Sequence, residues 1–386
     1  MFHKIKLHIS CASLWSLLVI AALTVSCSSS GSGNKSEGTG ACGVKEELQY
    51  ACGFEIEHFN GYTVVRIADP WKKRDYLQEY VLVEIGAPLP DGLPKGTLVR
   101  TPVQNIIMYT TIHASIWEEL NSLNAIAGIC EPEYLTSQKA KELVADGTIA
   151  DCGKASSPNV EKIMEIGGGI IIASPFEHGG YGQAEKLGIP IFESADYMEN
   201  HPLGRVEWMK VFGLLSGKRD MADSIFNAVS SRYNELKELA STVETRPLLM
   251  TERKYGSTWF IAGGASYMAQ MYSDAGADYI FRDNTETGSV PLSFENVYDT
   301  GLNSDFWLFK YDMPRPMTYA DLRSEYKPYE DFAPFRNRKI YTCNTVVTPY
   351  YEYIAIHPDY ILEDFVGIFH PHLLPNHKLR CYAPMQ

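Results

Sequence analysis

The feature that most constrains the fold is a long amphipathic segment in the middle of the chain, from about Arg205 to Ala240. No Pro or Gly interrupts residues 218–245, so one helix of about 25 residues and about 40 Å is expected there. The apolar positions of its expected buried face are Met221, Ile225, Phe226, Val229, Tyr233, Leu236 and Ala240. These positions follow the helical period, and charged residues fill the opposite side. We predict that this rod bridges two small lobes; the alternative is an ordinary helix covering a single sheet.

Short apolar strands alternate with helices on both sides of this segment, as in mostly parallel sheets covered on both faces. Before it, strands are expected at 103–109, 126–129, 169–173 and 189–192, with helices at 115–123, 136–145, 157–166 and 182–187. After it, strands are expected at 248–251, 258–262, 305–311 and 339–342, with helices at 266–275, 293–298, 319–325 and 358–369. The sequence therefore predicts an α/β fold with two Rossmann-like lobes, a bridging helix and a ligand cleft between the lobes.

The N-terminus has the pattern of an export signal. Lys4 and Lys6 precede an apolar run from Leu14 to Leu23, which is too short to remain as a transmembrane helix. Residues 23–27 resemble a bacterial lipobox, although Leu23 lies one position too early. We predict cleavage before Cys27, lipidation of that cysteine and a flexible Ser- and Gly-rich tether after it.

These signals divide the chain into six parts. They are a lipoprotein signal peptide at 1–26, a flexible tether at 27–53, a β-strand extension at 54–97, a first α/β lobe at 98–200, the bridging helix at 201–245 and a second α/β lobe at 246–386. Within the extension, Asn60-Gly61 between two alternating runs predicts a β-hairpin. A polar loop at 110–114 precedes the first helix of the first lobe, where Ser115 and Glu118 fit a capping box.

Composition argues against several function classes. The net charge is −13 and no basic stripe is visible, so nucleic-acid binding is not expected. Beyond Cys11 and Cys27, the cysteines are Cys42, Cys52, Cys130, Cys152, Cys343 and Cys381. Cys42 with Cys52, and Cys130 with Cys152, are plausible pairs by nearness, but sequence does not rank the pairings. The chain contains no CxxC, GxSxG, HExxH or Walker motif, so neither a zinc site nor a familiar catalytic site is indicated.

Two stretches placed alike in the two halves echo each other. In each, a glutamate, Glu161 or Glu295, opens a short helix, a glycine, Gly167 or Gly301, ends it, and a buried strand follows. A glutamate early in a helix is ordinary on its own, because it complements the helix dipole. The repetition in both halves is what singles out these two residues.

With these units, the chain resembles the substrate-binding proteins of ABC importers for iron–siderophore complexes, haem and cobalamin, over roughly residues 101–374. The other similar pieces are residues 259–268 and 357–371. The resemblance implies two lobes joined by a rigid helix, and a permease whose arginines receive Glu161 and Glu295. It also implies a small-molecule metal chelate as ligand, an ABC permease with its ATPase as partners, and contact with the membrane through the lipid anchor only. We expect a monomer without a cofactor of its own.

The cleft is expected at the loops that follow the strands, because ligands of open α/β sheets lie beyond the strands' carboxyl ends. The candidates are Thr110, Thr111, His113, Phe176, Glu177, His178 and Tyr181 in the first lobe, and Tyr255, Trp259, Tyr267, Tyr311, Tyr350, Tyr351 and Tyr353 in the second. Tyrosine rings can pack on a bulky chelate and their hydroxyls can bond its rim. Tyr or His can also ligate iron or haem, while core packing is the competing role of each tyrosine.

The function that the sequence favours is a lipid-anchored receptor of the periplasm or cell envelope, and not an enzyme. It would capture an iron chelate, either a siderophore complex or haem, and pass it to the permease. Cobalamin is the alternative ligand within the family, and a bare metal ion is a further one. An exported enzyme or chelatase is the alternative from another class. The rigid bridge also predicts only small closure of the lobes on binding.

Overall fold

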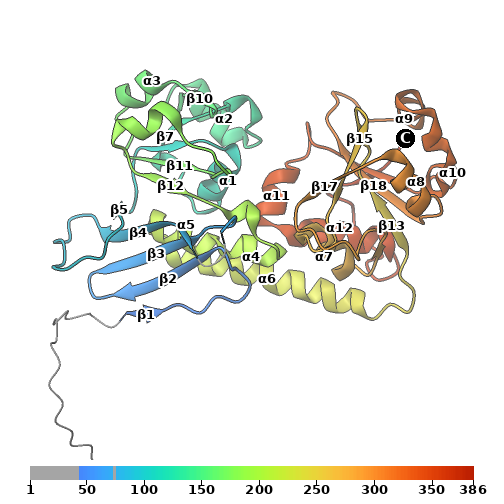
Figure 1. Ribbon diagram of the computed structural model, residues 1–386, viewed down its shortest axis with the longest axis horizontal. Helices are drawn as coiled ribbons and strands as arrows, with labels where there is room; N and C mark the ends of the chain where they lie inside the picture. Colours follow the sequence, from blue (N-terminus) through green and yellow to red (C-terminus); the bar gives the residue numbers. More distant parts are fainter. Residues whose placement is uncertain (1–42, 73–74) are drawn as a thin grey trace, which may run out of the picture. The chain divides into compact units, whose positions relative to one another are not determined.

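The computed structural model describes residues 43–72 and 75–386, within a unit that begins at Ala41. The predicted signal peptide, Cys27 and Cys42 lie outside the described residues. Among the described residues, no helix combines the length and the apolar character needed to cross a membrane. The described chain contains two doubly wound sheets, a further N-terminal sheet and a helical bridge (Figure 1).

The N-terminal sheet contains β1 (Val44–Lys45), β2 (Phe54–Phe59), β3 (Tyr62–Ala68), β4 (Tyr76–Glu84) and β5 (Thr97–Thr101), in this order. β2 and β3 form the predicted antiparallel hairpin, and Gly61 takes the left-handed backbone (φ 85°) that its turn requires. Phe54, Ile56 and Val65 are buried in the same core as apolar residues of the first lobe. The extension is therefore packed onto that lobe.

The segment Glu46–Gly53, which we call the strap, corrects the predicted tether boundary. β1 pairs with β2, and backbone N–H groups of the strap donate hydrogen bonds to the buried carboxylates of Glu199 and Glu207. The tether prediction is therefore wrong for residues 44–53. Its error has a physical reason: the groups that hold the strap lie about 150 residues further along the chain, beyond the reach of local pattern reading.

The first lobe is built on five parallel strands in the order β12-β11-β6-β7-β8. They are β6 (Ile106–Met108), β7 (Ile126–Ile129), β8 (Ala150–Asp151), β11 (Ile170–Ala173) and β12 (Ile191–Glu193), joined by α1 (Thr111–Glu119), α2 (Gln138–Ala145), α3 (Val160–Glu165) and the small antiparallel pair β9 (Gly153–Lys154) and β10 (Ser157–Pro158). β6 and β11 are buried along their whole length, as expected for central parallel strands.

Helix starts in this lobe differ from the prediction because other residues cap them. α1 begins at Thr111, where the Thr110 hydroxyl accepts the Ile112 N–H, so the expected capping box at Ser115 does not form. α3 begins only at Val160, because Asn159 accepts the Lys162 N–H. Asn and Thr are both strong N-cap residues, and each moves the boundary by a few positions.

The second lobe has strand order β16-β13-β18-β19-β20, with β20 antiparallel and the others parallel. These strands are β13 (Leu248–Thr251), β16 (Asp278–Tyr279), β18 (Phe306–Tyr311), β19 (Ile340–Asn344) and β20 (Ala383–Pro384). A separate antiparallel sheet contains β14 (Lys254–Tyr255), β15 (Thr258–Ala262) and β17 (Ser289–Leu292). The helices are α7 (Tyr267–Asp274), α8 (Phe294–Gly301), α9 (Tyr319–Glu325), α10 (Ala333–Arg336), α11 (Tyr350–Ile356) and α12 (Pro358–Phe369).

The bridge consists of α4 (Pro202–Glu207), α5 (Met209–Ser216) and α6 (Arg219–Ser241). Gly217 ends α5 in the left-handed conformation. α6 has 23 residues, or about 35 Å at the rise of an α-helix. Ala222 near its start packs in the core of the first lobe, whereas Tyr233 and Leu236 pack in the core of the second (Figure 1). The two-lobed α/β architecture with a bridging helix is thus confirmed.

Candidate functional site

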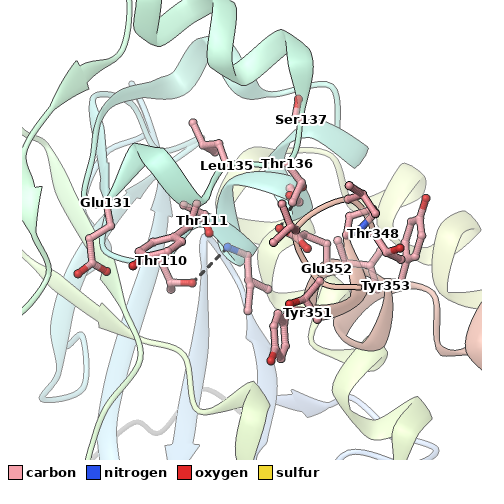
Figure 2. A pocket seen from close by; sticks show the side chains of 18 of the residues that line it. Thr110, Thr111, Glu131, Leu135, Thr136, Ser137, Thr348, Tyr351, Glu352 and Tyr353 are labelled. Carbon is pink, nitrogen blue, oxygen red and sulfur yellow. Dashed lines mark hydrogen bonds between the residues drawn. The ribbon is translucent and has the colours of Figure 1, made fainter. Parts of the chain in front are cut away.

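A cleft of about 1070 Å³ lies between the two lobes and is lined by residues of both. Much of its lining lies at the ends of parallel strands: residues 109–112 follow β6, Glu131 and residues 133–137 follow β7, Arg253 follows β13, 310–312 lie at the end of β18 and 345–349 follow β19. Figure 2 shows Glu131, Thr110 and Thr136 of the first lobe together with Tyr351, Glu352 and Tyr353 of α11. The cleft therefore lies where open α/β sheets bind ligands, with a volume suited to a bulky small molecule.

Five of the residues predicted for the cleft do line it: Thr110, Thr111, Tyr311, Tyr351 and Tyr353. The Thr110 side chain has a second task as the cap of α1, at 3.2 Å from the Ile112 nitrogen (Figure 2). Tyr351 is half exposed, so its ring is available to a ligand. The Tyr311 hydroxyl accepts the Met317 N–H at 3.1 Å, which fixes its ring at the end of β18.

Three predicted cleft residues belong instead to the cores of the lobes. His113 is buried because α1 begins at Thr111, and its Nε2 lies 3.1 Å from Oδ1 of the buried Asp196. Trp259 is also buried, and its Nε1–H donates to the Thr251 carbonyl at 3.0 Å. Tyr350 is buried in the core of the second lobe. For these residues the cleft prediction is wrong.

The other predicted residues lie away from the cleft lining. Phe176, Glu177 and His178 are exposed in the loop after β11, whereas the cleft lies over β6 and β7. The Tyr181 hydroxyl donates to Glu193 at 3.1 Å, so this ring turns toward β12. Two further tyrosines complete the set: Tyr255 is exposed at the end of β14, and Tyr267 packs partly against the core of the second lobe.

Several cleft residues were missed from the sequence. They are mainly charged or aliphatic: Glu118, Glu119, Glu131, Glu133, Leu135, Lys141, Arg253, Lys310, Asp312, Val346, Val347 and His357. The loops after β7 and β19 follow predicted strands, so the rule about carboxyl ends could have found them. The prediction instead selected mainly aromatic residues.

Partly exposed ion pairs neutralise the basic residues on the side of the second lobe. Lys310 Nζ contacts Glu252 Oε1, and this carboxylate raises the pKa of Lys310 although burial opposes the shift. Arg253 pairs with Glu325 at 2.8 Å. The basic residues that the second lobe presents to the cleft are thus paired, and the exposed side chains of Val346 and Val347 lie beside them in the lining.

Two polar contacts cross between the lobes beside the cleft. Thr136 Oγ1 donates to Glu352 Oε1 at 3.0 Å, and His357 Nε2 lies 3.5 Å from Glu119 Oε1. Apolar residues of α11 support these contacts, because Ala355 and Ile356 pack in the core of the first lobe. α11 is therefore a second connection between the lobes, in addition to α6.

The contact of His357 predicts a pH-dependent stability. Burial alone would lower the pKa of His357, but the Asp359 and Glu119 carboxylates outweigh it and raise the pKa from 6.5 to about 9. A raised pKa stabilises the fold fully below about pH 6.5, and this contribution disappears as the pH rises through about 9. We expect His357→Gln to cost about 1–3 kcal/mol at pH 6 and little at pH 9.5.

Melting temperatures at the two pH values test this expectation. The exposed His372 provides the matched control, since His372→Gln should leave the melting temperature unchanged at both. An equal loss for His357→Gln at pH 6 and pH 9.5 would contradict the assigned role of the imidazolium.

Glu161 and Glu295 occupy corresponding positions in the two lobes. Each is exposed in the first turn of a short helix, α3 or α8, two residues after the capping Asn159 or Ser293. Each helix also precedes a central strand, β11 or β18. The Glu295 backbone N–H and the Ser293 side chain lower the pKa of Glu295, so its carboxylate is ionised at neutral pH.

The cysteines correct one predicted pairing. Cys130 and Cys152 are buried neighbours after β7 and β8, but both are free thiols. The proposed pair of Cys42 with Cys52 includes a residue outside the described part. Over residues 43–72 and 75–386, no group of three or more His, Cys, Asp or Glu side chains is placed to hold a metal ion.

Two doubly wound lobes, a helical bridge and a cleft at the strands' carboxyl ends define a two-lobed solute-binding protein. The family described as "Periplasmic binding protein" matches residues 106–346, which is more than half of the chain. The chain belongs to this family, whose members serve ABC importers.

Individual relatives agree with this assignment. An uncharacterized lipoprotein of Methanocaldococcus jannaschii is 26% identical over 359 residues, covering 87% of this chain and 84% of that protein. A possible iron-binding periplasmic solute-binding protein of Staphylococcus epidermidis has a TM-score of 0.55 at 14% identity, covering 68% of this chain and 97% of that one. The IsdE protein of S. aureus, solved with haem, has a TM-score of 0.53 at 14% identity, covering 69% and 99%. At such identities the solved structures show the fold alone.

Proposed function

We propose that this protein captures an iron chelate, a siderophore complex or haem, in the cleft between its lobes and delivers it to an ABC permease. The observation that carries this proposal is the cleft itself, which is large and combines tyrosine rings with aliphatic side chains of the second lobe. Such a lining suits a bulky ligand with an apolar edge. The descriptions of the Staphylococcus structures as possibly iron-binding and haem-bound support the same ligand class.

Delivery requires a contact with the permease, and Glu161 and Glu295 are the residues that we propose for it. Their exposure and their corresponding places in the two lobes suit two charge-assisted pairs with arginines of a membrane partner. Carboxylate–arginine pairs of this kind are directional and often bidentate. They would therefore set the orientation of both lobes on the permease.

We further propose that the chain is anchored to a membrane of the cell envelope by lipidation of Cys27. The lipobox-like residues 23–27 support this, as does the lipoprotein description of the Methanocaldococcus relative. Mass spectrometry of the N-terminal peptide from the native membrane tests it. A diacylglycerol-modified Cys27 is expected, and an unprocessed Met1 or an unmodified Cys27 would contradict the anchor.

Purification of the full chain from iron-replete cells, followed by its visible absorption spectrum, tests the ligand class. We expect a bound chromophore, about one per chain, that is released unchanged on denaturation. Titration of the stripped protein with haem, ferric siderophores and cyanocobalamin should then give saturable binding to a ferric chelate or haem. Preference for cyanocobalamin would replace the ligand class, and chemical turnover of a bound compound would overturn the receptor function.

A further inference from the structure

The wall of the cleft formed by the first lobe has more carboxylates than basic side chains. Glu118, Glu131 and Glu133 all line it, and within the described residues none of them has an ion-pair partner. Lys141 is the only lysine or arginine among the described lining residues of this lobe. With three unpaired glutamates and one lysine, this wall has an excess of acidic side chains.

The wall formed by the second lobe supplies no unpaired positive charge to balance these carboxylates. Lys310 is held by Glu252 and Arg253 by Glu325, while His357 lies between Glu119 and Asp359. Asp312, also in the lining and exposed, adds a further negative charge. An anionic ligand would therefore find no unpaired cation on the second lobe. To obtain one, it would have to separate Lys310 from Glu252 or Arg253 from Glu325.

Tyr109 adds no charge to the wall of the first lobe. Tyr109, at the end of β6, lines the cleft although only 6% of it is exposed. Among the described residues, its hydroxyl has no hydrogen-bond partner. Burial raises the pKa of Tyr109, so the group stays neutral. The hydroxyl is buried near Cys130 and Cys152 and is not open to the cleft. Tyr109 therefore adds neither charge nor an accessible hydrogen-bonding group to this wall.

The two walls therefore prefer different faces of a ligand. The first lobe offers carboxylates, whereas the second offers Tyr351, Val346 and Val347. Carboxylates on one wall of a cleft produce a field that attracts cations and repels anions, and the field is strengthened by the surrounding protein of low dielectric constant.

We propose that the cleft is selective for chelates of net positive charge, which place their cationic edge against Glu118, Glu131 and Glu133 and their apolar edge against Tyr351 and Val347. Chelates with several negative charges, such as tris-catecholate complexes, are excluded, and haem is disfavoured by its two propionates. This inference rests on the proposed function, because it concerns the same cleft, and it specifies the ligand class more narrowly.

Two ferric chelates of similar size and opposite charge test the inference. One is a trihydroxamate with a free ammonium group, and the other is a tris-catecholate with three negative charges. Each is titrated into the full chain, with quenching of tryptophan fluorescence as the readout. We expect the cationic chelate to bind at least about tenfold more tightly, and its affinity to fall when salt is raised from about 20 mM to about 300 mM.

Variants that neutralise single glutamates show which carboxylates produce the charge selectivity. Glu131→Gln and Glu133→Gln should each weaken the cationic chelate by about threefold to tenfold. The matched control is Glu165→Gln, which removes the same charge from the exposed surface of α3, outside the cleft lining, and should change nothing. Melting curves of each variant report whether the fold is kept, and the comparison of the two chelates on the unchanged protein does not depend on any variant.

The outcomes separate this inference from the function on which it rests. Equal or tighter binding of the tris-catecholate would overturn the charge selectivity and leave the chelate receptor intact. Loss of the preference in Glu165→Gln as well as in Glu131→Gln would also overturn it, since the effect would then reflect overall charge. Failure of both chelates and of haem to bind would overturn the proposed function, and this inference with it.

Discussion

Replacement of both Glu161 and Glu295 by arginine is expected to abolish uptake while leaving ligand affinity unchanged. Each carboxylate is exposed at the start of a short helix, and neither lines the cleft. Arginine would place like charges opposite the arginines that we propose on the permease, and such juxtapositions cost several kcal/mol. A loss of uptake of more than about a hundredfold is therefore expected, measured as ligand accumulation by cells that carry the variant chain.

Single variants and a control with the same charge change test each glutamate separately. Glu161→Arg and Glu295→Arg should each reduce uptake strongly, because one lobe alone cannot set the orientation on the permease. Glu238→Arg introduces the same charge change on the exposed side of α6 and should support normal uptake. Normal uptake by the double variant, or a loss of ligand binding in the purified protein, would show that these glutamates do not dock the permease.

The parts of the fold that could be predicted from the sequence are those fixed by local pattern. Asn60-Gly61 identified its hairpin, and the period of residues 221–240 identified α6 and its buried face. The paired positions of Glu161 and Glu295 followed from repeated helix–glycine–strand units. In each case the residues that decide the structure are near one another in the chain, so periodicity and turn chemistry are sufficient.

The failures arose where distant residues decide. His113 was expected in a loop of the cleft. Instead, the Thr110 cap starts α1 early, and the His113 imidazole contacts Asp196 in the core. Trp259 was expected in the cleft because residues 255–259 follow a predicted strand, yet its side chain is buried in the second lobe. The acidic wall was also missed, since Glu131 and Glu133 line one cleft with Tyr351 only because the two lobes pack together.

The strap is a structural feature that was not predicted from the sequence. Glu207, fully buried in α4, accepts N–H groups of Gln49, Tyr50 and Ala51 at 2.9, 2.8 and 2.9 Å. Glu199 accepts those of Cys52 and Gly53 at 3.0 and 2.8 Å. Two carboxylates thus satisfy five consecutive backbone donors, which turns the segment before β2 into part of the bridge.

Other strap residues extend this attachment to both lobes. Glu46 forms a bidentate pair with Arg219 at the start of α6, at 2.9 and 2.6 Å. The Tyr50 ring stacks on His201 at 4.7 Å between centroids and packs against the core of the second lobe. Leu48 and Ala51 pack against the core of the first. The strap therefore contacts the bridge at the point where the lobes meet. Removal of the strap should destabilise both lobes.

Glu207→Ala is accordingly expected to destabilise the protein by about 3–5 kcal/mol, the range observed when one partner of a buried ionic network is removed. The substitution leaves three amide N–H groups without their acceptor and removes the 3.1 Å contact between Glu207 and Lys210. Each lost contact leaves a polar group without its partner, and water cannot fully replace that partner at a buried site. We expect the melting temperature to fall by about 5–10 °C, and hydrogen exchange at residues 49–51 to accelerate.

The matched control is Glu238→Ala, which removes a glutamate from the exposed side of α6 and should shift the melting temperature by less than about 1 °C. If Glu207→Ala melts like this control and its strap amides stay protected, the buried carboxylate does not hold the strap. If exchange accelerates in the strap and in α4–α6 together, while the sheet of each lobe stays protected, the strap is a structural member of the bridge. Because the lobes share that bridge, loosening it should also change how they move when a ligand enters the cleft.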